Sequence, residues 1–443
     1  MPSLSAALRA TPAGPPGVNP AAAPPPAAGA APAYARTGAR LGWATLAYLA
    51  CVVVTITLEP FVFRRPAAPG VVWWAADAPW HGWFDVVANV AMFAPLGFVA
   101  ALARSHRGGR RVSPARAFAL GAVASAAIEL VQRFEPGRYA SPTDVASNAA
   151  GAALGAWLCR RVAAKLGADT PLVGRLALEL PLTGLVYVTL PLLTLAGLTA
   201  GALPELQGTR ALGLAALAAF GGTLLGTLQR RQLGPAGVGP RATAAVAGGW
   251  FAAGAVPAAA TAPAVYAAGA AIAAAAAWCV GRDAALNVRA VERRFEGEAI
   301  GRAAPWLACY LSLVSLGDPG GEAWGRASVL RDLEHGAGFT VLGYLLAEAW
   351  GRRELRYRHA VWRVALTAVA AAGVSALLAA GAGGTVVPGA GVLLRAAAAT
   401  YGGWIYHLQR AHVRALVAAR TASVRVPGRP PRGSGPGAAP RWR

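Results

Sequence analysis

Polar residues at helical spacing interrupt the apolar sequence between residues 81 and 155. Asp85 and Asn89 are one helical turn apart, and so are Asp144 and Asn148. Each pair therefore shares one face of a helix. Carboxylates and amides inside apolar helices are costly to bury unless they are paired or hydrated, so they indicate a functional site.

A second group of polar residues lies in the stretch that connects these two pairs. Glu129 and Gln132 end the apolar stretch SAAIELVQ, and Arg138 and Ser141 follow it. Ser141 precedes a proline, which is typical of a helix start and places Asp144 near the positive N-terminal end of that helix. We expect Arg138 to pair with Glu129 or Asp144.

We call the candidate ligand-binding residues of this region the polar set, which consists of Asp85, Asn89, Glu129, Gln132, Arg138, Ser141, Asp144 and Asn148. Two carboxylates in different environments can divide acid and base roles, so Glu129 and Asp144 are also the candidate catalytic residues. The structural alternative is a hydrogen-bond and ion-pair network that locks three helices together.

The composition indicates that a membrane holds these residues. Of the 443 residues, 56% are hydrophobic and 14% are charged, and the mean hydropathy is +0.45. These values argue against a soluble enzyme. A helix needs about 20 apolar residues to span a bilayer, which predicts an all-α polytopic bundle with about twelve spans, near residues 41–63, 83–103, 115–134, 143–160, 177–203, 209–229, 242–258, 262–281, 303–317, 332–350, 361–381 and 390–409.

The net charge of +22 follows the same topology. With the N-terminus inside, 33 of the 41 Lys and Arg residues fall in inner segments, and 7, including Arg210 and Arg331, fall in outer loops. Such a bias predicts cytoplasmic N- and C-termini. The basic surface would face the anionic inner leaflet, so nucleic acid is not an expected partner. The polar set would then lie in the outer half of the membrane.

Cysteine and histidine spacing predicts neither a metal site nor a cofactor. The four cysteines lie far apart in apolar stretches, with no C-x-x-C, and the six histidines form no H-E-x-x-H or comparable pattern. We therefore interpret the cysteines as small packing residues.

The polar set and its neighbours resemble the VanZ-like family of bacterial membrane proteins, which is associated with teicoplanin resistance. The shared pattern is an Asp and an Asn before F-x-P-L-G, then S-x-x-I-E-x-x-Q, then R-x-x-S-x-x-D-V-x-x-N-x-x-G-x-x-x-G. In this chain it runs from Asp85 to Gly97, from Ser125 to Gln132, and from Arg138 to Gly155. The resemblance covers residues 41–164 and implies a four-helix membrane module without an established reaction.

A degenerate second copy of this pattern is predicted at residues 303–413. The stretch EHGAGFTVLGYLLA aligns His335 with Asn89, Phe339 with Phe93 and Gly343 with Gly97, and SALLAA from Ser375 replaces SAAIELVQ. An even number of intervening helices makes this a parallel repeat rather than the inverted kind of many transporters.

These observations divide the chain into five parts. The predicted parts are a disordered cytoplasmic tail at 1–38, the VanZ-like module at 41–164, a middle four-helix region at 177–281, the degenerate module at 303–413 and a disordered basic tail at 421–443. The expected localisation is the cell membrane, with both termini cytoplasmic and the lipid bilayer as a partner.

Three functions compete. The first is a non-enzymatic envelope protein that binds a lipid-linked cell-wall precursor or a glycopeptide at the outer leaflet. The second is a membrane enzyme that acts on a lipid phosphate or cell-wall precursor through Glu129 and Asp144. The third is a lipid or solute transporter, against which stands the confinement of the polar set to the outer half of the membrane.

Overall fold

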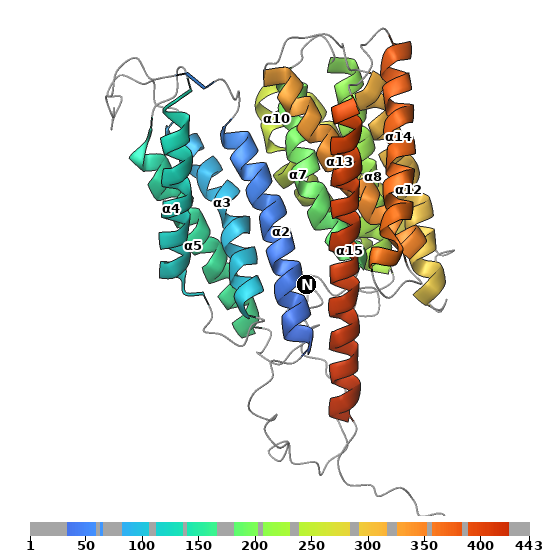
Figure 1. The fold of residues 1–443 in the computed structure, drawn as a ribbon, viewed down its shortest axis with the longest axis horizontal. Coiled ribbons are helices and arrows are strands. Elements are labelled where there is room, and N and C mark those ends of the chain that lie inside the picture. Colours follow the sequence, from blue (N-terminus) through green and yellow to red (C-terminus); the bar gives the residue numbers. More distant parts are fainter. Residues whose placement is uncertain are drawn as a thin grey trace, which may run out of the picture.

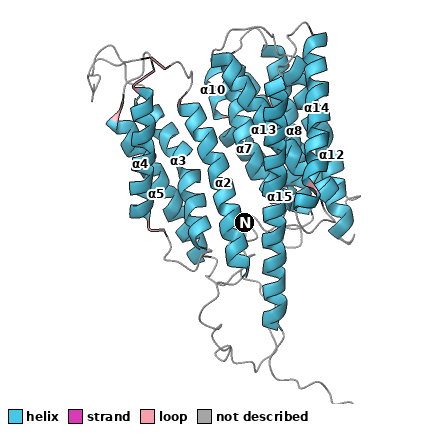
Figure 2. Ribbon diagram, viewed as in Figure 1, coloured by secondary structure: helices cyan, strands magenta, loops and turns pink. Residues whose placement is uncertain are grey.

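The structure is a computed structural model. It describes residues 33–58, 63–64, 82–105, 112–135, 140–165, 181–202, 207–230, 239–283, 292–316, 326–351, 357–382 and 389–424. Within these ranges every regular element is a helix (Figure 2). The predicted all-α fold is therefore confirmed.

The helices form two groups that lie beside each other (Figure 1). The N-terminal module consists of α2 (Ala33–Thr57), α3 (Gly82–Ser105), α4 (Pro114–Gln132) and α5 (Pro142–Lys165). The second group contains the middle helices α7 (Pro181–Ala202), α8 (Gln207–Leu228), α9 (Pro240–Gly254), α10 (Val256–Thr261) and α11 (Pro263–Arg282). The C-terminal helices, which complete it, are α12 (Glu292–Leu316), α13 (Arg326–Gly351), the short 3-10 turn η4 (Tyr357–His359), α14 (Val361–Gly381) and α15 (Gly389–Val424).

Where they are described, the twelve apolar stretches lie on helices, the seventh of them on two, and seven helices are long and apolar enough to cross a membrane. The seven segments are Ala35–Thr57, Asp85–Arg104, Pro114–Gln132, Gly208–Leu228, Pro263–Arg282, Ala299–Leu316 and Val361–Gly381. The chain is thus a polytopic helical membrane protein.

Several helix boundaries differ from the predicted ones. Residues 33–38 and 421–424, which the composition assigned to disordered tails, belong to α2 and α15; the rest of both predicted tails lies outside the described residues. The ninth stretch was predicted to begin at residue 303, but α12 begins at Glu292. A helix extends beyond its apolar stretch where charged residues carry it into the aqueous phase, and apolarity alone does not mark that end.

A short extra helix divides the seventh predicted span. Helix α9 ends at Gly254, and α10 begins at Val256 with Pro257 in its first turn. Proline lacks an N–H group and clashes with the preceding turn of a continuous helix, so it is tolerated at a helix start. The chain therefore breaks and restarts at this point.

Helix α2 joins the two groups. The Tyr401 hydroxyl of α15 donates a hydrogen bond to the Ala44 carbonyl of α2 at 2.8 Å, and the Tyr48 hydroxyl of α2 donates to the Val188 carbonyl of α7 at 3.3 Å. The N-terminal module thus contacts the rest of the protein mainly through one helix, which leaves α3, α4 and α5 on its far side (Figure 1).

Glycines allow α3 and α5 to approach closely. A Cβ atom on Gly97 would clash with the Ala152 carbonyl oxygen, and one on Gly155 would clash with the Ala94 carbonyl oxygen. Only glycine permits such backbone approach. Gly97, two residues after Pro95, therefore provides a point of close packing in α3. This contact fixes the relative register of the two helices that carry Asn89 and Asp144.

Candidate functional site

The described residues of the polar set lie at the end of the N-terminal module where α3 and α5 begin and α4 ends. The Asn89 side-chain amide donates a hydrogen bond from Nδ2 to Oδ1 of Asp144 at 2.9 Å. This bond joins α3 to α5 across the close glycine contact. Two residues that are 55 positions apart in the sequence therefore form one polar unit.

Glu129 connects α4 to the start of α5. Its Oε2 accepts a hydrogen bond from the backbone N–H of Ser141 at 2.8 Å. The Ser141 hydroxyl in turn accepts from the backbone N–H of Asp144 at 3.3 Å, so Ser141 caps α5 as its position before a proline predicted. Glu129 is thereby held by the turn that positions Asp144.

Hydrogen bonds made by buried side chains of the polar set hold these helices in place. The Asn148 amide donates from Nδ2 to the Ser125 hydroxyl at 2.9 Å, and Gln132 donates from Nε2 to the Thr57 carbonyl of α2 at 2.5 Å. The Asn148 Oδ1 atom is buried and has no hydrogen-bond partner among the described residues. These bonds tie α2, α4 and α5 together, which is the role that the structural alternative assigned to the whole set.

Exposure separates the set into two layers. Glu129, Gln132 and Asn148 are buried, whereas Asn89, Ser141 and Asp144 are half-buried and Asp85 is exposed. The buried layer can orient the accessible one, and only the accessible layer can touch a ligand without rearrangement. Its carboxylates accept hydrogen bonds from hydroxyl, amide and ammonium groups.

One predicted member cannot be placed. Arg138 lies outside the described residues, so its predicted pairing with Glu129 or Asp144 is a prediction still. Two partners, Ser125 and the Thr57 carbonyl, were not among the predicted site residues. Ser125 belongs to the S-x-x-I-E-x-x-Q pattern and could have been found from it, whereas a backbone carbonyl of another helix leaves no mark in the sequence.

A second polar cluster lies inside the protein, between the middle and the C-terminal helices. Glu334 on α13 accepts from Arg210 Nη1 of α8 at 2.5 Å and from the Tyr310 hydroxyl of α12 at 2.6 Å. Arg210 and Glu334 are 4% and 1% exposed. The assignment of Arg210 to an outer loop was therefore wrong. Arg210 begins an apolar stretch, and only the tertiary packing against Glu334 shows that it is buried.

The C-terminal helices repeat individual contacts of the N-terminal module. A Cβ atom on Gly343 would clash with the Ala399 carbonyl oxygen of α15, as one on Gly97 would clash with Ala152 of α5. Ser375 on α14 accepts from Arg395 Nη1 on α15 at 2.9 Å. In the N-terminal module, Ser125 likewise accepts a hydrogen bond, from Asn148.

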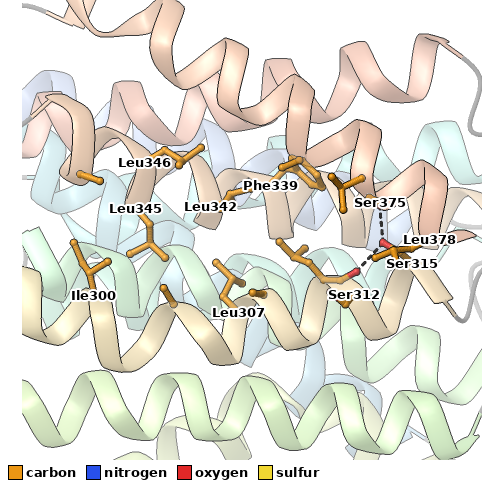
Figure 3. A pocket seen from close by; sticks show the side chains of 16 residues that line it. Ile300, Leu307, Ser312, Ser315, Phe339, Leu342, Leu345, Leu346, Ser375 and Leu378 are labelled. Atoms are coloured by element: carbon orange, nitrogen blue, oxygen red, sulfur yellow. Dashed lines mark hydrogen bonds between the residues drawn. The ribbon is translucent and has the colours of Figure 1, made fainter.

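An apolar cavity of about 390 Å³ lies between α12, α13 and α14. Its polar end is formed by Ser315 and Ser375, whose hydroxyls are 2.6 Å apart (Figure 3). Leu307, Phe339 and Leu345 line its apolar part. The N-terminal module encloses Phe93 in a small core with Ile128 and Ala152, while Phe339, the aligned residue, borders this cavity.

The described residues contain no group of three or more His, Cys, Asp or Glu side chains that could hold a metal ion. The chemistry that the accessible layer can perform with its own groups is hydrogen bonding and proton exchange at carboxylates.

Fold and site together define a polytopic helical membrane protein with a polar site at one end of its first four-helix module. Within that class, residues 41–164 match the family described as VanZ/LLP1. The match coincides with α2 to α5 and includes every residue of the polar set, so the N-terminal module is VanZ-like. No curated protein and no solved structure matches the chain.

Proposed function

We propose that the N-terminal module binds a hydroxyl- and amine-bearing ligand at the outer leaflet of the bacterial cell membrane, either a lipid-linked cell-wall precursor or a glycopeptide, and changes its access or placement. The supporting observation is the layered polar set. Buried Glu129 and Asn148 hold the α4–α5 turn and α5, and the half-exposed Asn89–Asp144 pair and the exposed Asp85 face outward. A purely structural network gains nothing from an exposed layer.

The accessible groups favour a ligand rich in hydrogen-bond donors. Asp85 and Asp144 carry acceptor oxygens, and carboxylates bind hydroxyl and ammonium groups strongly through charge-assisted hydrogen bonds. Sugars, amino sugars and peptide amines supply these donors. An apolar tail in the bilayer would bring them to the correct depth, and this is why lipid-linked and lipophilic glycopeptide ligands fit the site.

We further propose that residues 303–413 are a degenerate second copy of the module. In its support, the aligned pairs make the same kind of contact: Gly343 with α15 as Gly97 with α5, and Ser375 with Arg395 as Ser125 with Asn148. This copy retains the helix contact and replaces the accessible polar layer by buried charges. It would therefore serve as a scaffold and not as a second binding site.

A complementation experiment tests the ligand proposal. A strain that lacks the gene is complemented with the wild type, with Glu129→Gln or with Asp144→Asn at matched membrane levels, and glycopeptide sensitivity and envelope lipids are measured. Both variants should lose the wild-type phenotype. The control is Ser113→Ala, which removes the cap at the opposite end of α4 and should complement fully.

Photocrosslinking separates the two ligand sources. A lipid-linked disaccharide-peptide and teicoplanin, each with a photoreactive group, are presented to the purified protein in nanodiscs, and the crosslinked peptide is identified. A crosslink near Glu129 that forms with only one of the two probes identifies the class of ligand. Unchanged glycopeptide sensitivity together with no crosslink near Glu129 would overturn the proposal. Conversion of an envelope lipid into a product would support the enzyme function instead. Lipid flipping that is faster than in protein-free liposomes would support transport.

A further inference from the structure

The cavity between α12, α13 and α14 is long and narrow (Figure 3). Its lining on α12 runs from Ile300 to Ser315, which is almost the whole of the apolar segment Ala299–Leu316 of that helix. At 1.5 Å per residue these positions span roughly 22 Å along the helix. A volume of about 390 Å³ over that length corresponds to a channel roughly 4 Å wide, which is the separation of apolar groups in van der Waals contact. The cavity therefore has the shape of a single hydrocarbon chain.

The cavity opens toward the surface that faces the bilayer. Leu307, Phe339 and Leu345 form its buried floor, whereas Ala308 of α12 and Val374 of α14 are exposed at its rim. Both α12 and α14 contain segments that can cross a membrane, so their exposed side chains meet lipid. A lipid chain can therefore enter from the side, between these two helices.

The two buried serines at the polar end have no hydroxyl hydrogen to spare for a guest. The Ser315 hydroxyl donates to the Leu311 carbonyl at 2.7 Å. A hydroxyl has a single hydrogen, so Ser375 is the donor in the contact between the two serines. Ser375 also accepts a hydrogen bond from Arg395. Because these bonds are satisfied inside the protein, the contacts offered to a guest come mainly from the apolar wall.

An empty cavity of this size would be unfavourable. Side chains that line a void lose van der Waals contacts, and water gains little from an apolar wall with few hydrogen-bond partners. The aligned region of the N-terminal module is closed, since Phe93 packs there with Ile128 and Ala152. The cavity is therefore a property of the C-terminal helices, and the medium next to its rim, which is hydrocarbon, is the material that fits it.

We infer that the cavity binds one acyl chain of a bilayer phospholipid, which enters between α12 and α14 and lies along Leu307 and Leu345 with its headgroup outside. The chain is held by close packing, because transfer from lipid to an apolar wall gives no hydrophobic gain. The chemistry of the headgroup should therefore not matter. This site is separate from the polar set and does not depend on the proposed function of the N-terminal module.

Photocrosslinking of the full-length protein in nanodiscs tests this site. Phosphatidylcholine, phosphatidylglycerol and a polyprenyl phosphate, each with a diazirine within its hydrocarbon chain, are added in turn, and labelled residues are identified by mass spectrometry. Both phospholipids should label the buried residues Leu307, Phe339 and Leu345, and also Val123, which is exposed on α4 and reports the surrounding lipid. Labelling of Val123 without any of the three buried residues would overturn the inference. So would labelling of the buried residues by one headgroup alone or by the polyprenyl probe alone.

Two variants fill the cavity from opposite walls. Ala308→Phe on α12 and Ala371→Phe on α14 each place a ring in it. Both should abolish labelling of the buried floor and leave labelling of Val123 unchanged, which shows that the variant is folded in the membrane. The matched controls are Cys309→Phe and Ala370→Phe, at neighbouring exposed positions that do not line the cavity, and they should be labelled as the wild type is. Retained labelling of the floor in both filling variants, or its equal loss in both controls, would overturn the inference.

Discussion

In the N-terminal module, Asn89 and Asp144 join α3 to α5 at a half-exposed edge. In the C-terminal helices Glu334, one of the three acidic residues of α13, is buried and bonds Arg210 of α8 and Tyr310 of α12. Both regions use the same glycine-mediated contact between their second and fourth helices. The difference therefore lies in where the polar groups face. Polar groups at an accessible edge can bind a ligand, while those turned inward hold helices together and depend on one another.

The largest expected effect concerns the inward-facing cluster. Glu334→Gln should destabilise the protein by about 3–5 kcal/mol, because it leaves the buried Arg210 guanidinium without its carboxylate. Thermal unfolding in detergent measures this loss. The double variant Arg210→Gln/Glu334→Gln removes both charges and should regain part of the stability. A Glu334→Gln protein as stable as the wild type would mean that the cluster is not an ion-pair core.

The second prediction tests whether the two regions share a helix contact. Gly97→Ala and Gly343→Ala should each cost about 1–3 kcal/mol, because the new methyl group meets a backbone carbonyl of the partner helix. The control is Gly373→Ala on α14, where a Cβ atom meets nothing within 4 Å. That change should stabilise the helix by up to about 1 kcal/mol. Tolerance of one of the two test variants alone would break the equivalence.

The third prediction concerns the paired serines. Ser125→Ala should cost about 1–3 kcal/mol, because the buried Asn148 amide loses the hydroxyl that accepts its hydrogen bond. Ser375→Ala should cost more, since the Ser375 hydroxyl contacts both Arg395 and Ser315. Double-mutant cycles of Ser125 with Asn148 and of Ser375 with Arg395 measure each coupling free energy. A cycle without coupling would show that the aligned bonds differ in kind.

Much of this comparison was predictable from the sequence. Where they are described, the apolar stretches lie on helices, seven of which can cross a membrane, and Asp85 with Asn89 and Asp144 with Asn148 lie one turn apart on α3 and α5. The glycines Gly97 and Gly155, which belong to the family pattern, lie at the contact between α3 and α5. These features follow from local periodicity, which a single sequence contains.

The remainder depends on contacts between distant segments. Arg210 stands at the edge of an apolar stretch and looks like a loop residue until Glu334 of α13 is placed beside it. The start of α12 at Glu292 is likewise hidden, because a helix that leaves the apolar phase loses its hydropathy signal. Which polar residues face outward is decided by packing, and periodicity gives only the face that they share.

The smallest effect on stability is expected at the accessible layer, and it separates the two regions most sharply. Asp85→Asn should change the free energy of unfolding by no more than about 0.5 kcal/mol, because Asp85 is exposed. The same variant should weaken ligand crosslinking near Glu129, because an amide loses the charge that strengthens hydrogen bonds from hydroxyl and ammonium groups. Asp332→Asn, at an exposed position of α13, is the matched control and should leave crosslinking unchanged. If Asp85→Asn instead unfolds the protein, or if both variants crosslink as the wild type does, the accessible layer is part of the scaffold and the two regions do not differ in function.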